Sequence, residues 1–128
     1  MRNLATLSYK LRNVIPAVLW SGIIFFLCFL PGSAFPKEDW LDKIYFDKIV
    51  HAFLYFVLFF LIIRNFSAQT KATIFITSTL CIAQGILIEF IQDSSYIQNR
   101  SFDVYDILAN IIGVLFSISF RNKICKTS

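Results

Sequence analysis

The chain has 128 residues and a formal net charge of +4; 57% of its residues are hydrophobic, 15 are phenylalanine and only 16% are charged. An average soluble chain carries about 25% charged residues, so this composition excludes most soluble proteins and indicates an integral membrane protein. The length suits a single domain, residues 1–128. Three cysteines and one histidine are too few for a disulfide framework or a multi-histidine metal site, and we expect free thiols.

Four apolar stretches predict four transmembrane helices, at about residues 14–30, 47–63, 72–92 and 104–120. A spanning helix needs about 20 residues to cross the hydrocarbon core of a membrane. The uncharged cores of these stretches are slightly shorter, so their polar ends should lie at the headgroups. We therefore predict an all-α integral membrane bundle of four helices.

The first stretch has an alternative interpretation as a cleaved signal peptide, because the small residues Gly32, Ser33 and Ala34 follow it. Its apolar run is longer than the usual core of a signal peptide, so a retained helix is favoured. The next segment, residues 31–46, contains helix-breaking Pro and Gly and interfacial aromatic side chains such as Trp40. We expect it to form a short interfacial element on the outer surface.

The distribution of charge predicts how the helices are oriented, because Lys and Arg in short loops stay on the cytoplasmic side. One side of the membrane receives most of the basic residues: Arg2, Lys10, Arg12, Arg64, Lys71, Arg121, Lys123 and Lys126. The other side, with the helix ends beside it, receives all 8 acidic residues and the remaining cations, Lys37, Lys43, Lys48 and Arg100. Both termini are therefore expected in the cytoplasm, and the positive net charge reflects this topology and contact with anionic membrane lipids rather than nucleic-acid binding.

Polar residues inside three of the helices predict a site near their outer ends, because ionisable groups in a membrane are costly and commonly functional. Helical spacing places these residues on one face of each helix. They are Asp47, His51 and Tyr55 on the second helix, Gly85, Glu89 and Gln92 on the third, and Asp103, Asp106, Asn110 and Gly113 on the fourth. Arg100 lies just before the fourth helix, where its guanidinium could reach carboxylates or a phosphate. We expect the three faces to converge at one depth.

Several of these residues also have a structural interpretation. Asn110 and Gly113 suit a helix contact, and Asp103 suits a cap of the last helix. Glu89 must be protonated or paired, with Arg100, Lys48 or His51 as the candidate partners. The carboxylates and His51 are of the right type for a divalent ion, but no compact ligand motif supports one, so we assign neither a metal nor a cofactor.

The same residues resemble the three signature blocks of the VanZ-like membrane proteins. The blocks are Asp47-Lys48-x-x-His51-x-x-x-Tyr55, Gly85-x-x-x-Glu89-x-x-Gln92 and Arg100-Ser101-x-Asp103-x-x-Asp106-x-x-x-Asn110-x-x-Gly113. Their order and spacing match from residue 47 to residue 113. Residues 93–96 depart from the family pattern, in which an aromatic residue and a proline often precede the arginine.

The resemblance implies a small four-helix protein of the bacterial inner membrane, similar to the family member that confers low-level resistance to the glycopeptide teicoplanin. The binding residues that it implies are Asp47, Lys48, His51, Glu89, Gln92, Arg100, Asp103, Asp106, Asn110 and Gly113. We expect these residues to recognise a lipid headgroup, a lipid-linked cell-wall precursor or a glycopeptide. In this hypothesis Arg100 and Lys48 hold an anionic group.

Two other interpretations stay open. A membrane-embedded hydrolase or transferase would act on a lipid-linked substrate, with a divalent ion and with the catalytic candidates His51, Glu89, Asp103 and Asp106. A purely structural polar network would instead lock the four helices, or a homo-oligomer such as a dimer, together.

Overall fold

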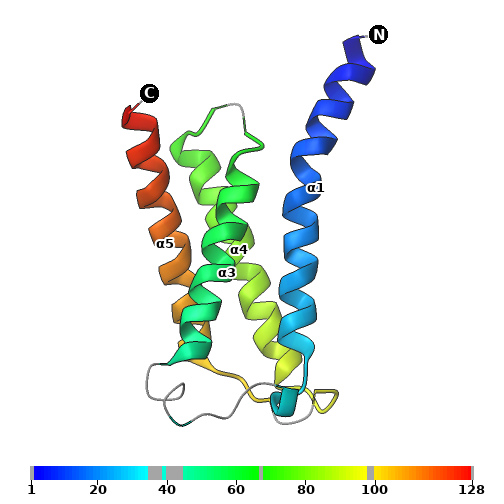
Figure 1. The fold of residues 1–128 in the computed structure, drawn as a ribbon, viewed down its shortest axis with the longest axis vertical. Coiled ribbons are helices and arrows are strands. Elements are labelled where there is room, and N and C mark those ends of the chain that lie inside the picture. Colours follow the sequence, from blue (N-terminus) through cyan, green and yellow to red (C-terminus); the bar gives the residue numbers. More distant parts are fainter. Residues whose placement is uncertain (1, 35–38, 40–44, 67, 98–99, 128) are drawn as a thin grey trace.

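The protein is described by a computed structural model that covers residues 2–34, 39, 45–66, 68–97 and 100–127. The regular elements of these residues are all helical (Figure 1). They are α1 (Arg2–Phe29), the short 3₁₀ helix η1 (Gly32–Ala34), α3 (Phe46–Ile63), α4 (Lys71–Gln92) and α5 (Val104–Thr127). The predicted all-α class is confirmed.

Four of these helices contain a segment long and apolar enough to cross a membrane: Arg12–Phe29, Phe46–Ile63, Lys71–Gln92 and Val104–Lys123. The chain is therefore a multi-pass membrane protein. The predicted bounds of α3 and α4 are correct to within one residue. The apolar span predicted from about residue 14 agrees with the spanning segment Arg12–Phe29, but α1 itself begins at Arg2, and α5 also continues past residue 120 to Thr127. Charged residues end the apolar span there, but not the helix, whose backbone hydrogen bonds are internal and persist in water.

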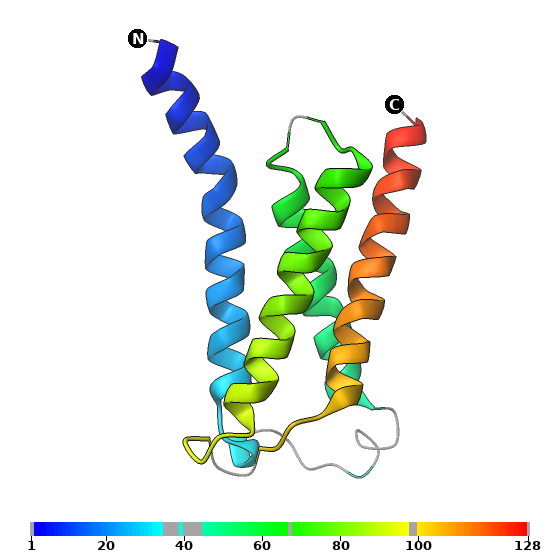
Figure 2. The same cartoon turned by 180° about the vertical axis from the view of Figure 1, so that it is seen from behind.

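The helices alternate in direction along the chain, so that α1 and α4 end, and α3 and α5 begin, at the same end of the bundle (Figures 1 and 2). We call this the polar end and the opposite one the terminal end, because the N-terminus of α1 and the C-terminus of α5 lie there (Figure 1). Two helices that begin at the same end run parallel. The first turns of α3 and α5 therefore meet, although more than fifty residues separate them in the sequence.

The predicted interfacial element between the first two helices falls mostly outside the described residues. It includes residues 35–38 and 40–44, with Trp40, which are not described. Its described beginning forms η1, in which the backbone N–H of Ala34 donates to the carbonyl of Pro31 at 2.9 Å.

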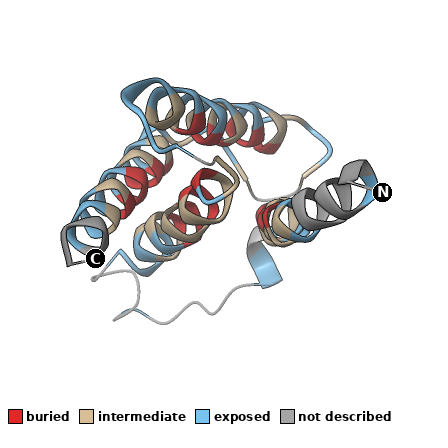
Figure 3. Cartoon of the chain, turned by 90° about the horizontal axis from the view of Figure 1, so that it is seen from above, coloured by how far each residue is buried: buried red, intermediate tan, exposed pale blue. Residues whose placement is uncertain are grey.

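Buried residues lie on the helix sides that face one another, and exposed residues lie on the outer sides (Figure 3). The core includes Tyr55, Leu58 and Phe59 of α3, Ile88 of α4 and Val114 of α5. Large apolar side chains cover the outer surface, among them Phe26, Phe53, Phe75, Phe90, Leu115 and Phe116. Such a surface would promote aggregation of a soluble monomer, whereas a helix that spans a membrane presents apolar side chains to lipid.

Hydrogen bonds attach α1 to the other helices at membrane depth. The indole Nε1 of Trp20 donates to the carbonyl of Leu54 at 2.9 Å, and the hydroxyl of Ser21 donates to Oε1 of Gln84 at 2.9 Å. Lipid tails supply no hydrophobic force between helices, so interhelical hydrogen bonds and close packing hold a membrane bundle together. The expected free thiols are observed for Cys28 and Cys81, both buried; the side chain of Cys125 lies outside the described residues.

A close contact joins α3 to α5 at Gly113. A Cβ atom on this residue would lie 2.1 Å from the carbonyl oxygen of Ala52 and 2.8 Å from its carbonyl carbon. Backbone atoms cannot move aside as a flexible side chain can. Glycine at this position is therefore what lets the parallel helices approach each other closely.

Substitution of this glycine tests the contact. We expect Gly113→Ala to lower the free energy of unfolding by about 1–3 kcal/mol, because the added methyl group overpacks the interface with Ala52. The measurement is thermal unfolding of the purified chain in detergent. Gly22→Ala is the matched control, since a Cβ atom there would meet nothing within 4 Å. Equal melting temperatures for the two variants would contradict the interpretation.

Candidate functional site

Lys48 lies at the centre of the polar end, in the first turn of α3. Its Nζ donates to Oδ2 of Asp47 at 2.8 Å, to Oδ2 of Asp103 at 2.5 Å and to Oδ1 of Asp106. An ammonium group has three donor hydrogens, so all of them have carboxylate acceptors. The prediction that Lys48 holds an anionic ligand does not fit this geometry, because three carboxylates already surround its charge.

Asp103 links this ion cluster to the start of α5. Its Oδ1 accepts a hydrogen bond from the backbone N–H of Tyr105 at 2.8 Å, so it caps the helix as the structural interpretation expected. Partial burial alone would raise the pKa of the Asp103 carboxyl. The hydrogen bonds from Lys48 and from the Tyr105 N–H outweigh this effect and lower the pKa below its usual value of 3.8.

His51 lies one turn beyond Asp47 on α3 and faces α5. Its Nδ1 lies 3.1 Å from Oδ1 of Asn110, and its Nε2 lies 3.6 Å from Oδ2 of Asp106. Both neighbours are buried residues of α5. The predicted convergence of the polar faces of α3 and α5 is therefore observed.

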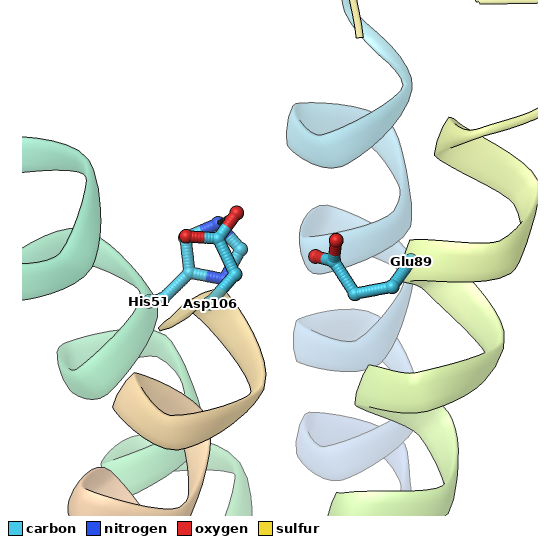
Figure 4. Close-up of side chains that lie close together, drawn as sticks. All are labelled: His51, Glu89 and Asp106. Carbon is cyan, nitrogen blue, oxygen red and sulfur yellow. Dashed lines mark ion pairs between the residues drawn. The ribbon is translucent and has the colours of Figure 1, made fainter. Parts of the chain in front are cut away.

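Glu89 reaches the same place from α4 and is only 1% exposed. Its Oε2 accepts a hydrogen bond from the backbone N–H of Asp103 at 2.9 Å, whereas its Oε1 is buried without a hydrogen-bond partner among the described residues. Figure 4 shows its carboxylate directed toward His51 and Asp106. One ligating atom of each of these three residues lies within 4.8 Å of the others.

Three residues expected at the site serve other contacts. The amide of Gln92 donates to the carbonyl of Cys28 at 2.7 Å, and Nε of Arg100 lies 3.4 Å from the carbonyl of Leu30. Both contacts join the α4–α5 region to the end of α1. Gly113 lies at the contact with Ala52. These residues hold the helices together around the site.

Tyr55 is a buried polar residue that the binding prediction omitted. It is 1% exposed, and its hydroxyl has no partner among the described side chains and backbone groups. The hydroxyl of Tyr55 and the amide of Asn110 both lie against Gly85, where a Cβ atom would be 3.4 Å from the former and 2.6 Å from the latter. The helical spacing from Asp47 and His51 did place Tyr55 on the polar face of its helix.

A second acidic group, formed by Asp47, Asp103 and Asp106, also has ligating atoms within 4.8 Å of one another. Lys48 donates to all three carboxylates, so a cation already occupies the centre of this group. The group of His51, Glu89 and Asp106 differs, because Oε1 of Glu89 lacks a hydrogen-bond partner in the described part of the chain.

Comparisons of the chain with models of protein families, with curated proteins and with solved structures find no match.

Removal of the central cation tests the ion cluster. We expect Lys48→Met to lower the free energy of unfolding by about 1–3 kcal/mol, because it leaves neighbouring carboxylates without their shared cation. The loss should shrink as the pH falls, since protonation removes the repulsion between these carboxylates. Thermal unfolding in detergent at several pH values measures both effects. Lys71→Met, at the exposed start of α4, is the control, and an equal loss in both variants would refute the role of Lys48.

Proposed function

We propose that this chain is a bacterial cell-envelope protein that recognises a polar headgroup, either of a lipid or of a lipid-linked cell-wall precursor, at the polar end of its bundle. The observation that carries the proposal is Glu89, a buried carboxylate in a membrane-spanning helix with one oxygen unpaired among the described residues. A group that is costly to bury in a membrane and incompletely satisfied indicates a function more than a packing role.

The resemblance to VanZ-like proteins supports the same proposal. Its three blocks come from three helices, and key residues of all three, His51, Glu89 and Asp106, lie at one point of the polar end. The spacing of residues along each helix does not by itself require that these three side chains lie close together. We therefore propose membership of this family and a contribution to low-level teicoplanin resistance.

The charge of the site indicates which ligand groups it would accept. Lys48 is surrounded by carboxylates, whereas Glu89 and Asp106 are hydrogen-bond acceptors when ionised. The ligand should therefore present donors such as hydroxyl, amide or ammonium groups. Lipid-linked wall precursors and glycopeptides carry such groups, and so do several lipid headgroups.

We further propose that the polar end faces away from the cytoplasm of the bacterial inner membrane. Basic residues gather at the terminal end, at the end of α3, the start of α4 and the end of α5: Arg64, Lys71, Arg121 and Lys123. Nη1 of Arg121 donates to Oε1 of Gln69 at 2.7 Å, which joins two of these regions. Short loops rich in Lys and Arg stay in the cytoplasm, and the polar end would then face the leaflet that carries externally exposed wall precursors.

A second candidate function is hydrolysis or group transfer on a lipid-linked substrate. The observation that favours it is the arrangement of His51, which has Asn110 at one ring nitrogen and the Asp106 carboxylate near the other. An imidazole oriented in this way suits a general base. An activity of the purified chain on a lipid-linked substrate would distinguish this function from binding alone.

Resistance measurements test the leading proposal. In a teicoplanin-sensitive bacterial host, we expect the wild-type chain to lower susceptibility and Glu89→Gln to lose this protection, because the amide nitrogen replaces an acceptor. Membrane abundance is matched by quantitative blotting. Asp93→Asn is the control, since Asp93 is exposed and its contact to the backbone N–H of Phe102 needs only one acceptor oxygen.

Three outcomes separate the interpretations. Protection by the wild type and the control, but not by an equally abundant Glu89→Gln variant, supports recognition by the polar end. A lack of protection by the wild type refutes the resistance proposal. A Glu89→Gln variant that fails to accumulate supports the structural network instead.

Fusion proteins test the proposed orientation. We expect green fluorescent protein fused after residue 128 to be fluorescent and alkaline phosphatase fused there to be inactive, because the terminal end should lie in the cytoplasm. The opposite pair of results would reverse the orientation of the polar end.

A further inference from the structure

The group of His51, Glu89 and Asp106 contains acceptor atoms without enough donors. The amide oxygen of Asn110 can only accept a hydrogen bond, and it lies 3.1 Å from Nδ1 of His51. Nδ1 therefore carries a proton and donates it. In the neutral imidazole the other nitrogen, Nε2, then has a free lone pair.

This lone pair faces oxygen atoms rather than donors. Oδ2 of Asp106 lies 3.6 Å from Nε2, and the Glu89 carboxylate is directed toward both residues from α4 (Figure 4). Oε1 of Glu89 has no hydrogen-bond partner within the described part of the chain, although the residue is 99% buried. Three acceptor groups that converge in a buried place repel one another unless a proton or a metal cation lies between them.

The cation that serves the neighbouring carboxylates does not complete this group. Lys48 donates to Oδ1 of Asp106, and the second oxygen of that carboxylate is the one that faces His51. Lys48 thus fixes the orientation of Asp106 in the way that outer hydrogen bonds orient metal ligands. Asn110 does the same for His51.

We propose that His51, Glu89 and Asp106 bind one divalent transition-metal cation through Nε2 and one carboxylate oxygen each. Imidazole and carboxylate ligands together suit zinc or manganese better than magnesium or calcium, which prefer oxygen ligands alone. Ligand atoms about 2.1 Å from a tetrahedral metal lie about 3.4 Å apart. The 3.6 Å between Nε2 of His51 and Oδ2 of Asp106 is already close to this spacing. All three ligating atoms lie within 4.8 Å of one another, so a small movement of the side chains would bring them to the distances that a metal requires.

Three protein ligands leave at least one coordination position for water or for a ligand group. The inference does not depend on headgroup recognition, because the metal site consists of this chain's residues alone. It extends the proposed function by giving the polar end a Lewis acid that could hold a hydroxyl or carbonyl oxygen.

Metal titration of the full chain tests the inference without any lipid ligand. The purified protein in detergent is stripped with a chelator and titrated with zinc, manganese or magnesium chloride by calorimetry, and with cobalt chloride by visible absorption. We expect about one equivalent of zinc or manganese to bind, magnesium to bind much more weakly, and cobalt to give the absorption bands of a nitrogen- and oxygen-ligated site.

Variants then identify the ligands. His51→Gln and Glu89→Gln should each weaken zinc binding at least tenfold and remove the cobalt bands, and Asn110→Ala should weaken binding roughly 10- to 100-fold as the loss of an orienting partner. Asp93→Asn should bind like the wild type. If Glu89→Gln does not fold, the wild-type cobalt spectrum and His51→Gln still decide the question.

The inference is overturned if the wild type binds no metal, or if His51→Gln binds as tightly as the wild type. A wild type without metal that still shows Glu89-dependent teicoplanin protection would refute the metal site and leave the proposed function intact. Metal binding by a wild type that gives no teicoplanin protection would support the metal site and refute the resistance proposal.

Discussion

The contact between α3 and α5 at Gly113 and Ala52 is the constraint on which the polar end depends. Both helices begin at that end, and the absence of a side chain on Gly113 lets their backbones meet. Their first turns are then close enough for Lys48 to donate to Asp103 and Asp106 and for His51 to reach Asn110. A wider separation of the helices would leave these polar groups facing lipid or each other across a gap.

Charge at the polar end follows the direction of the helices. Asp47 and Asp106 lie in the first turns of α3 and α5, where the helix dipole favours negative charge. Glu89 comes instead from the last turns of α4, whose dipole disfavours a carboxylate. The backbone N–H of Asp103 compensates one of its oxygens, and the other lacks a partner in the described residues. This difference distinguishes Glu89 from the acidic residues that Lys48 neutralises.

The buried polar residues therefore form two groups. One group holds the helices together, and the other presents acceptor atoms that have too few hydrogen-bond donors. Trp20, Gln92 and Arg100 donate to backbone carbonyls of other segments, which is how a membrane bundle replaces the hydrophobic force that lipid does not supply. His51, Glu89 and Asp106 present acceptors to one another. A cation or a donor-bearing ligand at this point would satisfy them.

The sequence by itself determined the class, the four spans and the faces of the helices, because hydrophobic and polar periodicity reports how each helix is buried. It could not place the start of α1, since charge ends an apolar span but not a helix. It predicted a site with Lys48 and Gln92 but not the partners of these residues, because spacing along one helix carries no information about which residues of another helix lie opposite. Only the tertiary structure, through the parallel approach of α3 and α5, decided that carboxylates surround Lys48 and that Glu89 faces His51 and Asp106.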